Sequence, residues 1–346
     1  MLSTFESLIS PPERVIRELT DHYPCVPFVT PEYIQACAAA GEIPCALLER
    51  EGELLSAGTI GFLRAGRLSS SLHIPTAPRL SDPGRYWQAL QWFCRRRRIW
   101  RLLVQSFASN NAVIPRLQGE TARYSRIEHV ITLGHGGNLS LSPDRRRNVA
   151  KARRAGLTIA ATRSASDLDL HASLVNAALH KRASRGEEIA VLGAASAPGA
   201  SLETAAASPF DLALLAVGAA ELFQARRGGE VLSSLFVIRA PQAVYSRSSG
   251  SSDLGMTLGA PTFVIAALAE RFQEEGKREF NLGGSGPPST GLWQFKAGFG
   301  GEQRPLEAVE VSTEPALIGA LRWASAIPRR WRRNRGAAAA GTEPHQ

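Results

Sequence analysis

The stretch REFNLGGSGPPSTGLWQFKAGFGGE, from Arg278 to Glu302, decides how the second half of this chain is interpreted. It places Lys296 among aromatic residues and glycines. Glycine lets a backbone approach a ligand closely, and aromatic side chains can exclude water from a charge. Lys296 could therefore meet an anion. Alternatively, the segment is a tight loop whose aromatic residues fill the core while the lysine reaches solvent. The pattern alone favours the loop, because aromatic residues are more often core than site.

The length and composition favour a globular protein with two domains. A chain of 346 residues exceeds the usual size of one hydrophobic core. Its hydrophobic fraction of 44% is that of an ordinary globular protein. The N-terminal segment MLSTFESLISPPERVIRELT lacks the basic start, apolar middle and cleavage site of a secretory signal. We therefore expect a cytoplasmic protein.

The cysteines and histidines indicate no metal site. Cys25, Cys37, Cys45 and Cys94 lack the paired spacing of a zinc site and show no disulfide framework. We expect reduced thiols that are mostly buried. His129 lies inside the apolar run IEHVITL, which favours a hydrogen-bonded strand residue over a ligand.

The net charge of +9 is concentrated in clusters at Arg95–Arg98, Arg145–Arg154 and Arg329–Arg335. Such clusters attract nucleic acid, anionic lipid headgroups or phosphate-bearing ligands. A solvated helix face is the commoner explanation for any single cluster.

The first half reads as an α+β unit. Residues 43–72 contain three short strands separated by the turns REGE and RAGR, which is typical of a β-meander. A helix over residues 82–97 follows, and then strands over residues 99–107 and 126–133.

The second half repeats this order after a basic helix. Ser142 is a natural N-cap, Pro143 and Asp144 suit the first turn, and Gly156 ends the helix before a strand. The elements expected after it are a helix over 166–185, a small-residue loop, a helix over 209–219, three strands within 221–252, a helix over 260–277 and a strand over 278–282. The last thirty or so residues indicate a helix and a loose tail.

The second half, over about residues 140–312, resembles the FemAB-like branch of the GNAT superfamily. The resemblance rests on the basic helix, the hairpin continuing into AVYSRSSGSS, the helix after GAP, and the opening stretch. The Phe-Lys pair followed by GFGG is its most specific feature, and NLGG supports it. This branch includes peptidoglycan-bridge aminoacyltransferases and BioF2-like acyltransferases. The first half resembles the partner domain more loosely.

The resemblance implies an α+β fold of tandem GNAT-like domains, each a mixed, mostly antiparallel sheet flanked by helices. We expect an N-terminal GNAT-like domain over residues 1–138 and a FemAB/BioF2-like domain over residues 139–314. Residues 315–346 would form a C-terminal helix and basic tail.

The resemblance also implies transfer of an acyl or aminoacyl group to an amine, in cell-envelope, peptidoglycan or polysaccharide metabolism. Negative charge develops on the carbonyl oxygen in such a reaction, and a preorganised cation stabilises it. Phe295 and Lys296 match the pair that engages the donor and stabilises the transition state, which reverses the preference for a loop. The further donor- or substrate-binding candidates are Tyr245, Arg247, Ser251, Ser252, Gly283, Gly284, Trp293, Arg147 and Lys151.

Three features depart from the family pattern. Exposed amides at the helix start near Pro261 could hold a phosphate, but the Q/R-x-x-G-x-G/A signature is missing there, which puts the standard coenzyme A pose in question. Asn281 stands where many relatives carry aspartate, so a carboxylate is missing. The segment after Arg185 is too short for the helical arm of the larger bridge-forming enzymes.

Other functions are less well supported. Pro287 and Pro288 prevent the helix that a nucleotide-binding glycine loop needs, and no G-x-S-x-G elbow is present. We expect no tightly bound cofactor, with acyl-CoA or aminoacyl-tRNA as co-substrate and no DNA partner. The alternative is a non-catalytic GNAT scaffold that binds RNA or anionic membrane through its basic patches. The cluster at Arg329–Arg335 would then provide peripheral contact at the inner face of the membrane.

Overall fold

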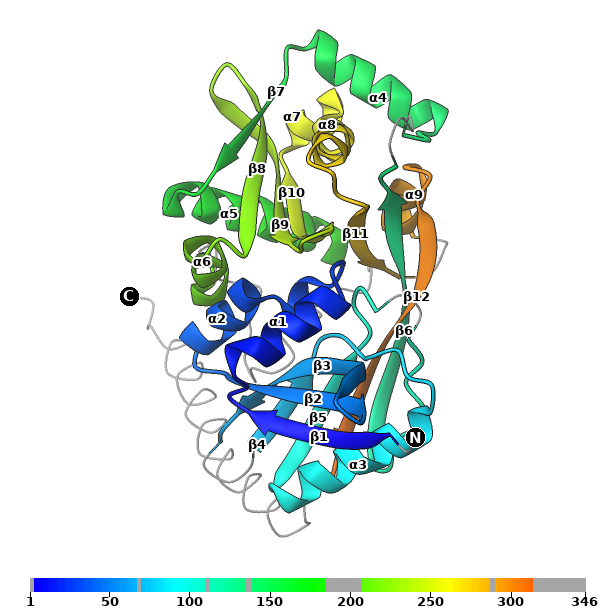
Figure 1. Cartoon of the computed structure of the whole chain (residues 1–346). Coiled ribbons are helices and arrows are strands. Elements are labelled where there is room, and N and C mark those ends of the chain that lie inside the picture. Colours follow the sequence, from blue (N-terminus) through cyan, green and yellow to red (C-terminus); the bar gives the residue numbers. More distant parts are fainter. Residues whose placement is uncertain are drawn as a thin grey trace, which may run out of the picture.

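One continuous sheet runs through the molecule (Figure 1). The computed structural model describes residues 3–66, 70–109, 112–134, 139–184, 207–286 and 290–313. From edge to edge, the strands within these residues are β1 (Thr4–Ile9), β2 (Ile43–Glu51), β3 (Leu54–Arg64), β4 (Ser70–Ile74), β5 (Ile99–Gln105), β12 (Glu302–Ser312), β6 (Glu120–Thr132), β11 (Glu279–Ser285), β10 (Ala243–Ser251), β9 (Glu230–Arg239), β8 (Ala220–Arg227) and β7 (Thr158–Thr162).

The helices begin where capping residues predict. They are α1 (Glu13–His22), α2 (Pro31–Ala39), α3 (Pro83–Arg96), α4 (Pro143–Arg154), α5 (Ala165–Ala183), α6 (Pro209–Ala216), α7 (Asp253–Leu258), α8 (Ala260–Glu274) and α9 (Gly291–Ala297), with a 3₁₀ turn at Pro27–Val29. The side chains of Asp82 and Ser142 accept hydrogen bonds from the first turns of α3 and α4. Gly156, with φ of +72°, follows the end of α4. The predicted helices over 82–97 and 142–155 are confirmed.

The two halves repeat one order of elements, as the sequence predicts. In the first half, β2, β3 and β4 form an antiparallel meander, and α3 crosses over to β5, which pairs in parallel with β4. In the second half, β8, β9 and β10 form the meander, and α7 and α8 lead to β11, parallel to β10. The α+β class, with a mixed and mostly antiparallel sheet flanked by helices, is confirmed.

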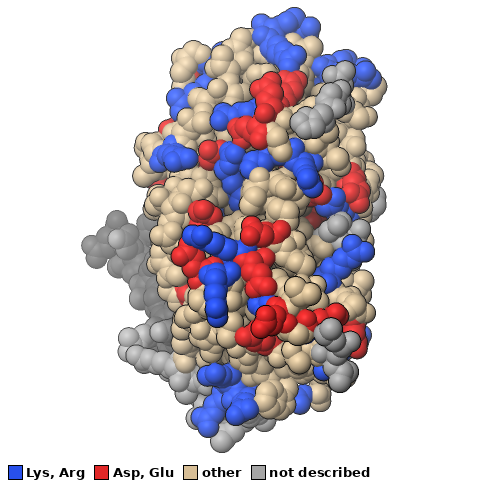
Figure 2. All heavy atoms as spheres, viewed as in Figure 1, with Lys and Arg blue, Asp and Glu red and all other residues tan. Residues whose placement is uncertain are grey.

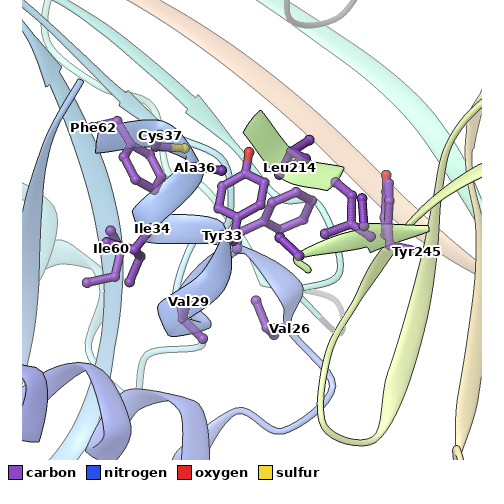
Figure 3. Packing of buried hydrophobic residues seen from close by; sticks show 14 of the residues in the cluster. Val26, Val29, Tyr33, Ile34, Ala36, Cys37, Ile60, Phe62, Leu214 and Tyr245 are labelled. Carbon is purple, nitrogen blue, oxygen red and sulfur yellow. The ribbon is translucent and has the colours of Figure 1, made fainter. Parts of the chain in front are cut away.

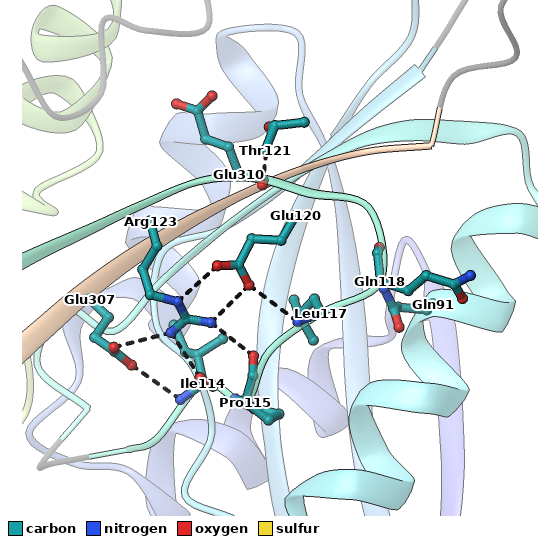
Figure 4. A network of polar contacts seen from close by, with 10 residues as sticks. All are labelled: Gln91, Ile114, Pro115, Leu117, Gln118, Glu120, Thr121, Arg123, Glu307 and Glu310. Atoms are coloured by element: carbon teal, nitrogen blue, oxygen red, sulfur yellow. Dashed lines mark hydrogen bonds and ion pairs between the residues drawn. The ribbon is translucent and has the colours of Figure 1, made fainter.

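The halves exchange strands at the centre of the sheet. Strand β12 pairs with both β5 and β6, and β6 pairs in turn with β11. Figure 4 shows how Arg123 of β6 is held there: its guanidinium contacts Glu120 at 3.0 Å and Glu307 of β12 at 3.1 Å. Strand β6 belongs to the expected N-terminal domain but pairs with β11, and β12 belongs to the expected C-terminal domain but pairs with β5. The division of the chain after residue 138 stays a prediction.

A shared hydrophobic cluster packs the halves together (Figure 3). Tyr33 of α2, Leu214 of α6 and Tyr245 of β10 are buried in it. The ring of Phe28 lies 5.4 Å from that of Tyr245, edge to face. Because burial of one such side chain stabilises a fold by about 1.5–3 kcal/mol, this cluster fixes Tyr245 at the junction of the halves.

The remaining structural predictions concern thiols, metals and termini. All four cysteines are free, three are buried, and burial raises the pKa of Cys94 to about 12. The described residues contain no cluster of three or more metal-ligating side chains. Among them, no helix has the length and apolar character needed to span a bilayer. The predicted loop after Arg185, the Pro287–Pro288 pair and the predicted C-terminal helix and tail lie outside the described residues.

Candidate active site

The parallel pair β10 and β11 separates after only three residues. Pairing runs from Ala243 with Glu279 to Tyr245 with Asn281 and stops there. Each strand then shifts register, β10 between Ser246 and Ser248 and β11 between Asn281 and Gly284. Gly283 lies in the second shift with φ of +73°, a conformation that favours glycine. The separation leaves backbone carbonyls that need a donor.

Lys296 supplies that donor. Thr290 caps α9, and Lys296 lies in its last turn. The Nζ atom donates to the carbonyl oxygens of Gly283 at 3.0 Å and Gly284 at 2.9 Å. The alternative of a loop with an outward lysine is therefore wrong: residues 291–297 form α9, which turns a half-buried lysine toward the gap. Its expectation that aromatic residues fill the core is confirmed for Phe299, which is 1% exposed.

A buried carboxylate, which the sequence analysis did not select, lies beside the gap. Glu128 of β6 is 1% exposed and stands opposite Gly284 in the strand register. Its Oε1 accepts a hydrogen bond of 2.9 Å from the Tyr245 hydroxyl, and its Oε2 accepts one of 3.1 Å from the Ala108 amide. A Cβ placed on Gly283 would lie 3.7 Å from both the Tyr245 hydroxyl and Lys296 Nζ. The three polar side chains thus meet around Gly283.

The charges around the gap shift the pKa values of both ionisable partners. Burial lowers the pKa of Lys296 to about 7, the positive charge of Arg126 lowers it as well, and Glu128 opposes them. Arg126 also donates to the Gly284 carbonyl at 3.4 Å. Burial raises the pKa of Glu128, while its hydrogen bond from Tyr245 opposes that rise. An ammonium and a carboxylate that both titrate closer to neutral pH than usual are typical of acid–base sites.

Comparison with known proteins shows which protein family the second half resembles. Residues 143–297 match the model of the acetyltransferase (GNAT) domain. The second half of the chain is therefore similar to a GNAT domain over these residues. The expected resemblance to that superfamily is confirmed, and a GNAT domain supports N-acyltransferase activity. No curated protein matches the chain by sequence.

Solved structures share the fold over nearly the whole chain. FemX aligns with a TM-score of 0.59 and 11% identity, covering 87% of this chain and 96% of its own. A tandem GNAT protein from the clavulanic acid biosynthesis pathway aligns with a TM-score of 0.51 and 11% identity, covering 91% and 99%. L-PGS from Bacillus licheniformis aligns with a TM-score of 0.50 and 11% identity, covering 90% and 96%. The tandem arrangement expected from the sequence agrees with these likenesses of fold.

Asn281 shapes the gap of the GNAT domain. Its Oδ1 accepts a hydrogen bond of 2.7 Å from the Gly283 amide, which stabilises the register shift. The same side chain lowers the pKa of Glu128. Residue 281 itself carries no carboxylate, as the sequence analysis states, but Glu128 brings one to the gap from another strand. Its sequence signal was a charged residue within the mostly apolar run RIEHVITL.

The aromatic candidates pack around α9. Arg145 of α4 lies over the Phe295 ring at 4.5 Å. The Trp293 ring lies 5.9 Å from that of His129. The His129 Nε2 atom shares a hydrogen bond of 2.9 Å with Ser285, as expected of a strand histidine, and burial lowers its pKa to about 4. Contact of Phe295 or Trp293 with a donor stays a prediction.

Three candidates on or just after β10 turn away from Lys296. Arg247 binds Asp211 of α6 at 2.7 Å. Ser251 shares a hydrogen bond of 2.7 Å with Ser233. Ser252 caps α7. The structure therefore brings Tyr245, Gly283, Gly284 and Lys296 together and leaves these three outside that group.

The expected phosphate site at the start of α8 is wrong in its geometry. The six-residue helix α7 lies between β10 and α8. The first turn of α8 then packs on α4, so that a Cβ on Gly259 would lie 2.7 Å from the Asn148 carbonyl oxygen. Ala260 is fully buried. The amides near Pro261 are thus covered, while the other α4 candidates, Arg147 and Lys151, are exposed to solvent.

A cavity of about 280 Å³ lies between the halves and reaches the same region. Its lining includes Tyr23, Ala108, Glu279 and Arg304. One lining residue, Ala108, donates its amide to Glu128, so the cavity lies one residue away from the carboxylate.

Proposed function

We propose that the protein is an N-acyltransferase that moves an acyl or aminoacyl group from an activated donor to an amine. The observation that carries this proposal is the meeting of Lys296 and Tyr245 at Gly283, with Glu128 behind Tyr245. A scaffold that only bound a partner would have no need to bury a glutamate beside a half-buried lysine at a break in its sheet, because such charges are costly to remove from water. This pair therefore favours catalysis over the scaffold alternative.

The groups divide the reaction between them. The neutral amine attacks the carbonyl carbon of the donor, a C–N bond forms, and the carbonyl electrons move to oxygen. The Lys296 ammonium stabilises that oxyanion. The amine proton passes to the Tyr245 oxygen as the Tyr245 hydroxyl proton passes to Glu128, so one proton is transferred in all. The oxyanion then re-forms the carbonyl and expels the thiolate or alkoxide of the donor, which is reprotonated.

The donor is an acyl-CoA or an aminoacyl-tRNA. The start of α8 is covered by α4 and presents no free backbone amides to a phosphate. This argues against binding of coenzyme A in the standard GNAT pose. Arg147 and Lys151 lie exposed on α4, which suits phosphate contacts with a long polyanionic donor. Trp293 and Phe295 remain candidates to contact the acyl end, and Gly283 and Gly284 form the floor of the gap.

The acceptor is an amine on an envelope precursor, a polysaccharide or a small metabolite, and we place the protein among FemAB-like relatives in the cytoplasm. The fold shared with FemX supports this placement. The cavity between the halves gives such an acceptor a route to Glu128.

The donor is tested first by thermal shift of the purified protein with a panel of acyl-CoAs, because a ligand that binds the native state raises its apparent stability. A saturable shift that depends on the acyl chain would identify an acyl-CoA donor. No shift with any of them would direct the assay to charged tRNA.

Catalysis is tested with the matched variants Lys296→Met and Lys277→Met. Lys277 also donates to two backbone carbonyls, those of Ala240 at 2.8 Å and Pro241 at 2.9 Å, but lies outside the gap. We expect Lys296→Met to lose about 1,000-fold in transfer rate and Lys277→Met to keep it. Equal rates in both variants would show that Lys296 only caps the strands.

A further inference from the structure

The segment from Pro83 to Gly119 is strongly basic. It contains no aspartate, glutamate or lysine. Its arginines are Arg85, Arg95, Arg96, Arg97, Arg98, Arg101 and Arg116. In the structure this segment forms α3, β5 and the loop before β6. Helix α3 lies at the end of the molecule opposite α4 (Figure 1).

These arginines are not neutralised by the fold. Within the described residues, none of them forms an ion pair, whereas Arg123, Arg239 and Arg304 each pair with two carboxylates. Arginines in the last turn of a helix offset its dipole, which accounts for part of the run at the end of α3. The dipole does not account for Arg85 at the start of the helix or Arg101 in β5. The surface therefore keeps a positive charge that an external anion could match.

An exposed tryptophan lies within this surface. The inner face of α3 buries Tyr86, Trp87 and Phe93, so the helix is already packed on the sheet. Trp92 points the other way and is 60% exposed. The guanidinium of Arg96 covers its ring at 5.2 Å. Tryptophan with one covered face and a free edge, surrounded by arginine, suits the polar–apolar boundary of a bilayer.

We propose that the α3 surface, made by Arg85, Trp92 and Arg95–Arg98, docks the protein on an anionic lipid bilayer. Figure 2 shows Lys and Arg side chains gathered at the lower edge of the view, where Figure 1 places α3. Guanidinium groups bind headgroup phosphates, and each basic residue near such a surface adds to the attraction. A membrane fits better than RNA, because bases stack on free aromatic faces and Arg96 already covers one face of the Trp92 ring.

The first test is co-sedimentation of the full chain with vesicles. Vesicles of phosphatidylcholine alone are compared with vesicles that also contain phosphatidylglycerol. We expect the protein to sediment only with the second kind. The double variant Arg96→Gln/Arg97→Gln should lower that partition roughly 30-fold, given the contribution of each basic residue at an anionic surface. The matched double variant Arg146→Gln/Arg154→Gln removes two exposed charges from α4 and should change it less than about twofold.

The second test follows tryptophan fluorescence. Binding to anionic vesicles should shift the emission to shorter wavelength, and Trp92→Phe should remove most of that shift while the melting temperature is kept. An equal loss of partition in the α4 double variant, or unchanged partition in the α3 double variant, would overturn the proposal. It would also be overturned if the α3 double variant bound vesicles normally but lost binding to tRNA, since the surface would then serve RNA.

Discussion

The parallel strand pairs of the two halves occupy equivalent places in the fold, yet one stays closed and the other opens. In the first half, the parallel pairing of β4 with β5 ends at Ile74 and Val104, but the chain segments beyond it stay joined by an isolated antiparallel bridge between Thr76 and Ser106. A hydrogen bond of 2.7 Å from the Ala77 amide to the Gln105 carbonyl and one of 3.1 Å from the Phe107 amide to the Pro75 carbonyl flank this bridge. In the second half, pairing of β10 with β11 stops at Tyr245. The same order of elements thus produces two different local structures.

The difference shows why the candidate active site lies at the strand pair of the second half. Just beyond β4 and β5, backbone amides and threonine hydroxyls satisfy the carbonyls: Thr59 donates to the Thr76 carbonyl at 2.6 Å, and Thr76 donates to the Phe107 carbonyl at 2.7 Å. Where two register shifts separate β10 from β11, the carbonyls of Gly283 and Gly284 accept hydrogen bonds from Lys296. Tyr245 lies at the same gap and donates its hydroxyl to Glu128. The candidate chemistry therefore follows from a break in the sheet and not from the fold as such.

Among variants that keep Lys296, the largest effect should come from removing the proton acceptor at the open pair. Glu128→Gln keeps a side-chain oxygen for the Tyr245 hydroxyl but cannot take its proton, so we expect about 100-fold slower transfer with little loss of stability. Tyr245→Phe breaks the same relay.

The double variant Glu128→Gln/Tyr245→Phe tests whether the two residues act together. Its rate should be no lower than that of the slower single variant, because residues that act as a unit are not additive. Multiplied losses, measured as kcat/KM for the same donor and amine, would contradict the relay.

The second prediction concerns pH. The folded-state pKa of Lys296 is about 7, so its ammonium is lost as pH rises through that value. If the ammonium stabilises the oxyanion, kcat/KM should fall about tenfold per pH unit above about 7. The same profile rising through pH 7 would instead make neutral Lys296 a base.

The third prediction concerns Arg123, a charged residue that we expect to affect stability and not catalysis. Arg123 joins β6 to β12 through Glu120 and Glu307 and also donates to two backbone carbonyls. Arg123→Met leaves these partners unsatisfied, so we expect a loss of about 2 kcal/mol in unfolding free energy. Chemical denaturation measures it, and an unchanged midpoint would show that backbone pairing alone holds the exchanged strands.

The last prediction is a pH dependence of stability caused by Lys296. Because its pKa is lowered on folding, the unfolded chain binds more protons between about pH 7 and the ordinary lysine pKa. The stability of the native protein should therefore rise with pH in that window relative to Lys296→Met. The difference in melting temperature between the two proteins, followed across this range, gives the test. A constant difference would mean that Lys296 titrates normally.

Local patterns predicted much of the fold because their causes are local. The cap at Ser142 with Pro143, and the turns of both meanders, place the elements within a few residues of their observed bounds. The prediction failed at the start of α8, because the chain forms the extra helix α7 and α4 covers the amides. No short pattern specifies how two distant helices pack.

The sequence by itself determined the order of elements in the two meanders and the helices that follow them, the resemblance to the GNAT superfamily, and Lys296 as a candidate site residue. Only the tertiary structure decided that Lys296 turns inward and that Glu128, 117 residues from Tyr245, is its neighbour in the site. The physical reason is that a buried charge needs partners from several strands. Those partners are set by strand exchange and register, which depend on packing across the whole sheet and not on neighbouring residues in the chain.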